Sequence, residues 1–264
     1  MSDDVVTATV TEGVGRMQIE RPESLNAFTP RVLEELHDAI RSFEADDDVR
    51  AILFTAAGDK AFCAGVDLGD EGGLSESTPE ALDTVHRAQR VLKALRRTPL
   101  PVVGGVNGYA MGAGMDLALG CDIRVVRADA ELSQSYVNVG LSPGDGGAYM
   151  LPRLVGEEVA KDLIFSGRRI SGTEAKELGI ASTVVDGDAE RTREVAFDRA
   201  RELADGPTVA LGNAKQLVNE AHDVNMETGL EHAIEALGEC RETDDHAEAI
   251  TAFDEKREPE FRGE

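Results

Sequence analysis

The first half of the sequence alternates short apolar runs with amphipathic helical patterns. The runs at 49–55 and 100–106 are rich in β-branched residues, and a third covers 121–126. Helical patterns stand between them, at 78–97 and from residue 112. Strands that alternate with helices at this spacing predict βαβ units and a largely parallel sheet. The chain should therefore fold as an α/β protein.

The start of the sequence and the part after residue 140 do not show this strand–helix alternation. A hairpin is expected at 5–10 and 17–20, followed by a helix from residue 29. After a loop at 140–147, the chain reads as mostly helical. The expected helices cover 157–166, 173–178, 189–204, 208–218, 228–240 and 246–256. We expect a core over 1–200 and a helical region over 201–264 that packs on a neighbouring subunit.

The balance of charge excludes several classes of partner. The 264 residues hold 51 Asp and Glu against 27 Lys and Arg, a net charge of −24. Such a polyanion is repelled by nucleic acid and by anionic lipid surfaces. Acidic residues spread over the whole chain favour a protein kept soluble in a salt-rich cytoplasm. The acidic start lacks an apolar leader, and the apolar segment 100–120 carries Asn107, Asp116 and six glycines, so no membrane span is expected.

Several common site signatures are absent from the sequence. Three cysteines lie far apart, at 63, 121 and 240, which argues against disulfides and a zinc ribbon. The five histidines make no metal-ligand spacing, so no metal is expected. Neither a phosphate-binding G-x-x-x-x-G-K-[ST] loop nor a G-x-S-x-G nucleophile turn occurs.

Two glycine-bearing loops each follow a predicted buried strand. The first spans 60–68 (KAFCAGVDL) and the second 107–117 (NGYAMGAGMDL). Ligands of open α/β sheets bind at the carboxyl ends of strands, and small residues there let backbone N–H groups approach closely. One amide from each loop could form an oxyanion hole. Tight turns with glycine used for packing explain the same residues equally well.

These loops resemble those of the crotonase superfamily, the enoyl-CoA hydratase/isomerase family. The resemblance extends over almost the full chain. It includes 21–27 (RPESLNA), 134–147 (QSYVNVGLSPGDGG), 152–156 (PRLVG), 166–168 (SGR), 175–180 (AKELGI) and 252–257 (AFDEKR). It implies a ClpP/crotonase-like spiral of ββα repeats with a helical C-terminal oligomerisation region, assembled as a trimer or a dimer of trimers.

The resemblance also implies a reaction centre. The backbone N–H groups of Val66 and Ala113 would hold the oxygen of a thioester enolate. Asp116 occupies the column of the first hydratase glutamate, whereas Tyr136 occupies that of the second, so the two-carboxylate arrangement is incomplete. Asp145 is the nearest replacement acid, although the isomerase acid column aligns with Gly144. We expect Asp116 and the Ala113 amide to face one pocket, with Tyr136 on its rim.

Coenzyme A contacts follow from the same motifs. Lys256 would meet a nucleotide phosphate, often across a subunit boundary, and two apolar side chains would lie near the adenine. The implied CoA-binding residues are Glu23, Ser24, Leu25, Ala64, Asp67, Leu68, Leu237, Phe253 and Lys256. No metal, nicotinamide or flavin is implied, because coenzyme A is part of the substrate.

Hydration of a 2-enoyl-CoA is the activity that the resemblance favours most. A Δ3,Δ2-enoyl-CoA isomerase is the main alternative, because one carboxylate can carry a proton between two carbons. A non-catalytic acyl-CoA-binding homologue would keep the fold without turnover.

Overall fold

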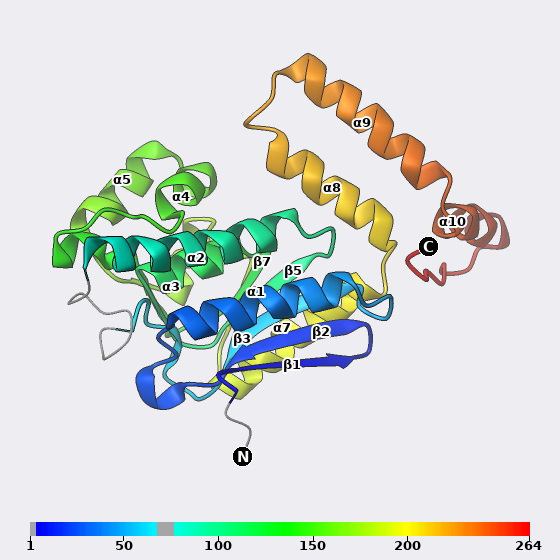
Figure 1. The fold of residues 1–264 in the computed structure, drawn as a ribbon. Coiled ribbons are helices and arrows are strands. Elements are labelled where there is room, and N and C mark those ends of the chain that lie inside the picture. Colours follow the sequence, from blue (N-terminus) through cyan, green and yellow to red (C-terminus); the bar gives the residue numbers. More distant parts are fainter. Residues whose placement is uncertain (1–3, 68–76) are drawn as a thin grey trace.

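The computed structural model describes residues 4–67 and 77–264, and its centre is a six-stranded sheet (Figure 1). The strand order is β1-β2-β3-β5-β7-β10. These strands are β1 (Val6–Thr11), β2 (Val14–Ile19), β3 (Ala51–Ala56), β5 (Val102–Val106), β7 (Ile123–Arg127) and β10 (Thr183–Val185). The β1–β2 hairpin is antiparallel and every other pairing in this sheet is parallel. The parallel sheet that the strand–helix alternation predicts is therefore confirmed.

A second, four-stranded sheet is built from very short strands. Its order is β4-β6-β8-β9. These strands are β4 (Ala61–Cys63), β6 (Tyr109–Met111), β8 (Glu131–Ser133) and β9 (Ile170–Ser171). Each of β3, β5 and β7 in the large sheet is followed along the chain by one strand of the small sheet, which is the repeating ββα plan that the resemblance implies. Strands of two or three residues are too short to show periodicity, so the sequence patterns did not predict them.

Ten α-helices and two 3₁₀ turns complete the described residues. The α-helices are α1 (Pro30–Glu44), α2 (Thr78–Arg97), α3 (Ala113–Gly120), α4 (Gly147–Val155), α5 (Glu157–Ser166), α6 (Gly172–Glu177), α7 (Ala189–Ala204), α8 (Thr208–Glu220), α9 (Met226–Arg241) and α10 (Asp244–Glu255). The 3₁₀ turns are η1 (Pro22–Ser24) and η2 (Ser135–Val139). Helix α1 begins as expected, because Pro30 fixes the first turn and the Thr29 side chain accepts from the Val32 N–H.

Helix α4 was not expected from the sequence. It starts at two successive glycines and contains Pro152, and both features normally argue against a helix. Its position matters because its first residue follows Asp145 by only two places.

The core consists of two apolar layers on opposite faces of the large sheet. Along β3, Ile52 and Phe54 face the larger cluster with α1 and α2, whereas Ala51 and Leu53 face α7. This alternation follows from the two-residue period of a strand. Helix α7 packs closely because it presents alanines at four-residue spacing; they are Ala196, Ala200 and Ala204. The two glycine-bearing loops lie at the edge of this core.

Helices α8, α9 and α10 extend away from the sheet as an arm (Figure 1). Large apolar side chains remain exposed along it, including Val218, Ile234 and Phe253. The end of the chain returns to the core, where Arg50 donates to the carbonyl oxygen of Phe261 at 2.8 Å. The division between 1–200 and 201–264 stays a prediction. Within the described ranges, no helix is long and apolar enough to span a bilayer.

Candidate active site

The two glycine-bearing loops lie directly against each other. Residues of the first loop pair with Phe28, which donates to the Gly65 carbonyl and accepts from the Asp67 N–H. A methyl group at Gly65 would come within 2.9 Å of the Met111 carbonyl oxygen in the second loop. A methyl group at Gly114 would overlap the Cys63 carbonyl oxygen. Glycine at these positions therefore allows the close approach of the two backbones.

The amides of Val66 and Ala113 are placed to act as donors beside one cavity. Since Phe28 uses the carbonyl and N–H groups on either side of Val66, the Val66 N–H points away from Phe28. Ala113 is the first residue of α3, where an N–H has no partner within the helix. Both residues line a cavity of ≈ 160 Å³. Its described lining is Ala64, Gly65, Val66, Met111, Gly112, Ala113, Ser135, Tyr136, Val139 and Leu141.

Asp116 lies in the first turn of α3 and is only 1% exposed. Gln134 donates through Nε2 to its Oδ1 at 2.6 Å, and the hydroxyl of Tyr136 lies 2.8 Å from its Oδ2. The Gly147 N–H, at the start of α4, also faces this carboxylate. Burial raises the pKa of Asp116, and the hydrogen bonds from Gln134, Gly147 and Tyr136 act in the opposite direction.

Tyr136 connects Asp116 with Asp145. Its hydroxyl oxygen lies 2.8 Å from Oδ2 of Asp116 and 2.9 Å from Oδ2 of Asp145. Burial raises the pKa of Asp145 to about 6, with a smaller rise from the Asp116 charge. Burial and then the two carboxylates raise the pKa of Tyr136 well above its usual value, so the phenol keeps its proton.

The structure brings the three predicted acid–base residues together, with Tyr136 between the two aspartates. Tyr136 lines the cavity and lies in η2. Asp116 does not share the pocket with the Ala113 amide, because it is buried and reaches the lining through Tyr136.

Two residues of the site were missed by sequence reasoning. Gln134 stands in a quoted motif, but nothing there assigned its amide to Asp116. Gly147 also has a specific role, because a methyl group there would overlap Asp116 Oδ1 and Gln134 Oε1. The only sign of this role in the sequence was the pair of successive glycines at 146 and 147.

The predicted coenzyme A residues fall into two separate groups. Leu25 adopts a left-handed conformation after η1, and its carbonyl accepts from the Ala64 N–H at 3.1 Å, which joins the segment of Glu23 and Ser24 to the first loop. Asp67 pairs with Arg21 at 2.8 Å, and Leu68 lies outside the described residues.

The second group lies on the arm. Leu237 and Phe253 are exposed on α9 and α10, and Lys256 ends α10. Figure 1 shows this arm far from the loop at 21–25. One chain therefore does not bring the two groups together.

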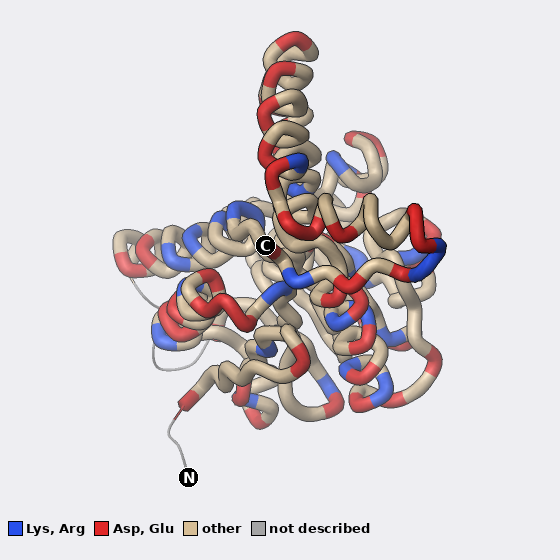
Figure 2. The backbone as a smooth tube through the Cα atoms, turned by 90° about the vertical axis from the view of Figure 1, so that its right-hand side faces the viewer, with Lys and Arg blue, Asp and Glu red and all other residues tan. Residues whose placement is uncertain are grey.

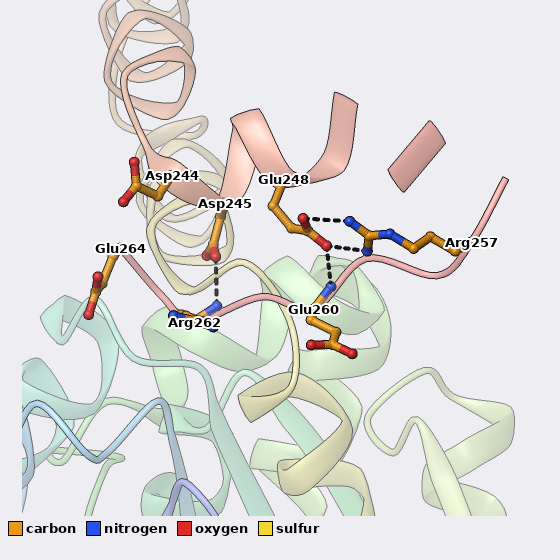
Figure 3. Close-up of a pocket in the computed structure, with 7 residues that line it drawn as sticks. All are labelled: Asp244, Asp245, Glu248, Arg257, Glu260, Arg262 and Glu264. Atoms are coloured by element: carbon orange, nitrogen blue, oxygen red, sulfur yellow. Dashed lines mark hydrogen bonds and ion pairs between the residues drawn. The ribbon is translucent and has the colours of Figure 1, made fainter. Parts of the chain in front are cut away.

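A second hollow lies where the chain end meets α10 (Figure 3). Glu248 accepts from Arg257 and from the Glu260 N–H, and Asp245 accepts from the N–H groups of Arg262 and Gly263. The pairing with Arg257 lowers the pKa of Glu248 to about 2. These carboxylates hold the chain end in place through hydrogen bonds, and their negative charge would repel an anionic ligand. Among the described residues, no group of three acidic, His or Cys side chains is arranged to hold a metal.

Comparison with known proteins shows the family of the chain. The sequence profile of the family described as enoyl-CoA hydratase/isomerase matches residues 9–264. The chain belongs to the enoyl-CoA hydratase/isomerase family. This match supports an enzyme of the family, and the crotonase-type fold that the resemblance implied is confirmed.

Individual members of the family match along nearly their whole length. The short-chain-enoyl-CoA hydratase of Clostridium acetobutylicum is 35% identical over 247 residues, which cover 94% of this chain and 93% of the relative. The 1,2-epoxyphenylacetyl-CoA isomerase of Escherichia coli is 34% identical over 264 residues, covering 98% and 99%. A crystal structure of enoyl-CoA hydratase from Bacillus anthracis superposes with a TM-score of 0.93 at 32% identity, covering 99% and 100%.

Proposed function

We propose that this protein is an enoyl-CoA hydratase that works through a thioester enolate. The supporting observation is the pair of loop amides, Val66 and Ala113, at one cavity whose wall holds Tyr136. Two fixed N–H donors suit an oxygen that gains negative charge when the thioester becomes an enolate. Asp116 moves the proton, Tyr136 orients substrate or water, and Asp145 assists.

A Δ3,Δ2-enoyl-CoA isomerase is the second candidate. It is favoured by Tyr136, which stands where the hydratases of the family have their second glutamate. The relative named 1,2-epoxyphenylacetyl-CoA isomerase also supports an isomerisation. A non-catalytic acyl-CoA-binding protein is the remaining alternative and predicts binding without turnover.

The cellular setting is part of the proposal. The substrate is an acyl-CoA of fatty acid metabolism, and no cofactor beyond its coenzyme A is required. The exposed apolar side chains of the arm support a homotrimer or a dimer of trimers, in which Lys256 reaches the neighbouring subunit's coenzyme A. The net charge of −24 supports a salt-rich cytoplasm of a halophile, without nucleic acid or membrane partners.

The test supplies crotonyl-CoA and 3-hexenoyl-CoA to the protein in concentrated KCl and deuterated water, with products identified by mass spectrometry. Hydrated crotonyl-CoA supports the hydratase, whereas a 2-enoyl product from 3-hexenoyl-CoA without hydration supports the isomerase. Tight binding without any product would support the binding protein.

Asp116→Asn should reduce kcat by about 100-fold or more, because an amide cannot accept the proton. Circular dichroism checks that the variant folds. A variant with unchanged kcat would exclude Asp116 from the proton transfer.

A further inference from the structure

If Asp116 and Asp145 were both ionised, the Asp116–Tyr136–Asp145 set would have one hydrogen too few for its two short contacts. The Tyr136 hydroxyl carries a single hydrogen, yet its oxygen lies within hydrogen-bond distance of a carboxylate oxygen on each side. If both aspartates were ionised, one of these short contacts would join two acceptors. One carboxyl group must therefore be protonated and donate to the phenol oxygen.

The surroundings of the two aspartates show which one holds this proton. Asp116 accepts from Gln134, from Gly147 and from Tyr136, which is the environment of a charged carboxylate. Asp145 has Tyr136 as its hydrogen-bond partner, and its other oxygen is buried without a partner among the described residues. The chain of donors thus runs from Asp145 through Tyr136 to Asp116.

Among the described residues, no cationic side chain faces Asp145 and interrupts this chain. The titratable groups that face Asp145 are Tyr136 from η2 and Asp116 from α3. Helix α2 contributes Gln89, which donates to the Gly144 carbonyl at 2.8 Å, and the apolar Val85 and Leu92. Burial, with a smaller contribution from the Asp116 charge, therefore favours the protonated form of Asp145.

Only one member of the chain reaches the cavity. Tyr136 is the single titratable side chain in the described lining, on the same wall as the amides of Val66 and Ala113. We propose that Tyr136 is the catalytic residue that exchanges a proton with the substrate, and that Asp116 and Asp145 act through it as acceptor and donor. This inference rests on the proposed function and specifies its proton path.

The proton count balances for hydration. As water adds to the β-carbon, the π electrons move to the thioester oxygen, Tyr136 takes a proton from the water, and its own proton passes to Asp116. The enolate α-carbon then takes a proton from Tyr136, and Asp145 transfers its own proton to the Tyr136 oxygen. Transfer from Asp116 through Tyr136 to Asp145 restores the starting state. For the isomerase, the same phenol would remove a proton from one carbon and return it to another.

The first test is Tyr136→Phe, with Tyr149→Phe as its matched control. Tyr149 also donates to an aspartate, Asp223, at 2.8 Å, but on the surface and away from the cavity. We expect Tyr136→Phe to lose about 100-fold or more in kcat while its KM changes by less than about threefold. The control should keep both. A Tyr136→Phe variant that loses less than about tenfold in kcat would overturn the inference, since Asp116 would then reach the substrate itself.

The second test uses Asp145→Asn and the pH profile. The kcat/KM of the wild type should fall as pH rises through about 6, because Asp145 then gives up the proton that it supplies. Asparagine can donate a hydrogen bond to Tyr136 but cannot release a proton, so kcat should fall and this limb of the profile should disappear. A profile identical to that of the wild type would contradict the relay.

A titration without substrate separates this inference from the proposed function. The carboxyl carbons of the protein labelled with ¹³C-aspartate should show Asp145 titrating near 6 in the wild type. In Asp116→Asn its pKa should be lower but still above the ordinary value, because the burial of Asp145 remains. If the wild type turns over no acyl-CoA but titrates in this way, the function fails and the shared proton stands. If it turns over substrate and Asp145 titrates independently of Asp116, the inference fails alone.

Discussion

At the scale of single residues, Gly147 is a position where one added carbon would meet the acid–base residues directly. Its N–H faces Asp116, and a methyl group there would overlap both Asp116 Oδ1 and Gln134 Oε1. Gly144, in the same loop, is different, because a methyl group there would meet Val85 at an ordinary 3.5 Å. The two glycines therefore form a matched pair.

We expect Gly147→Ala to destabilise the fold by about 1–3 kcal/mol through overpacking. It should also reduce kcat, because the methyl group displaces Asp116 from Tyr136. Gly144→Ala should keep its melting temperature. The measurements are thermal unfolding and turnover of the acyl-CoA that the wild type accepts. Equal melting temperatures for the two variants would show that the loop relaxes around the added carbon.

The identities of the site residues were more predictable than their contacts. The motifs around Asp116, Tyr136 and Asp145 indicated that these residues belong to one site. That Tyr136 covers Asp116 depends on the path of the loop at 140–147 and on the start of α4, which no periodic pattern encodes. Residues nine positions apart in irregular backbone meet only when the whole loop is formed.

At the scale of elements, one buried charge on α8 contacts the core. Lys215 donates to the carbonyl oxygens of Leu95 and Leu100 and pairs with Asp122 at 2.8 Å. The Lys215 and Asp122 side chains are 6% and 22% exposed, whereas Lys161 and Glu157 form a similar pair that is 59% and 80% exposed. Burial should decide the difference between these pairs.

Lys215→Met should destabilise the protein by about 3–5 kcal/mol, because it leaves Asp122 and two carbonyl groups without their partner. Lys161→Met is the control and should leave the stability almost unchanged, because its pair with Glu157 is exposed to solvent. Urea unfolding measures both. A loss of similar size in the two variants would mean that water reaches Asp122.

The long elements were predictable and the short ones were not. The ranges expected for β3, α2, β5 and α7 agree with the structure within a few residues, because each shows several periods of its pattern. Strands β4, β6, β8 and β9 are held by tertiary pairing rather than by local preference.

At the scale of the whole molecule, charge is the dominant feature. Figure 2 shows Asp and Glu distributed along the helices and loops in view, with Lys and Arg between them. The chain has 21 arginines and six lysines. The described ion pairs are accordingly made mostly by arginine, whose planar group can bind two oxygens, as Arg257 does with Glu248. These pairs leave most of the acidic excess uncompensated.

The folded protein should therefore gain stability as KCl rises from low to molar concentration. Repulsion within a charge of −24 favours expansion, and the screening length falls to about 3 Å at 1 M salt. Thermal unfolding in a KCl series measures this, and a sucrose series separates screening from general solvent effects. Equal stability at both ends of the KCl series would remove the proposed adaptation to salt.

The proposed oxyanion hole consists of main-chain groups and the proposed proton chain of side chains, and this difference has an evolutionary consequence. The amides of Val66 and Ala113 belong to the main chain, so replacement of most side chains around them leaves the enolate-binding half intact. The proton chain consists entirely of side chains at 116, 136 and 145, each of which one codon can change. Descendants of such a chain can therefore acquire a different reaction without rebuilding the part that recognises the thioester.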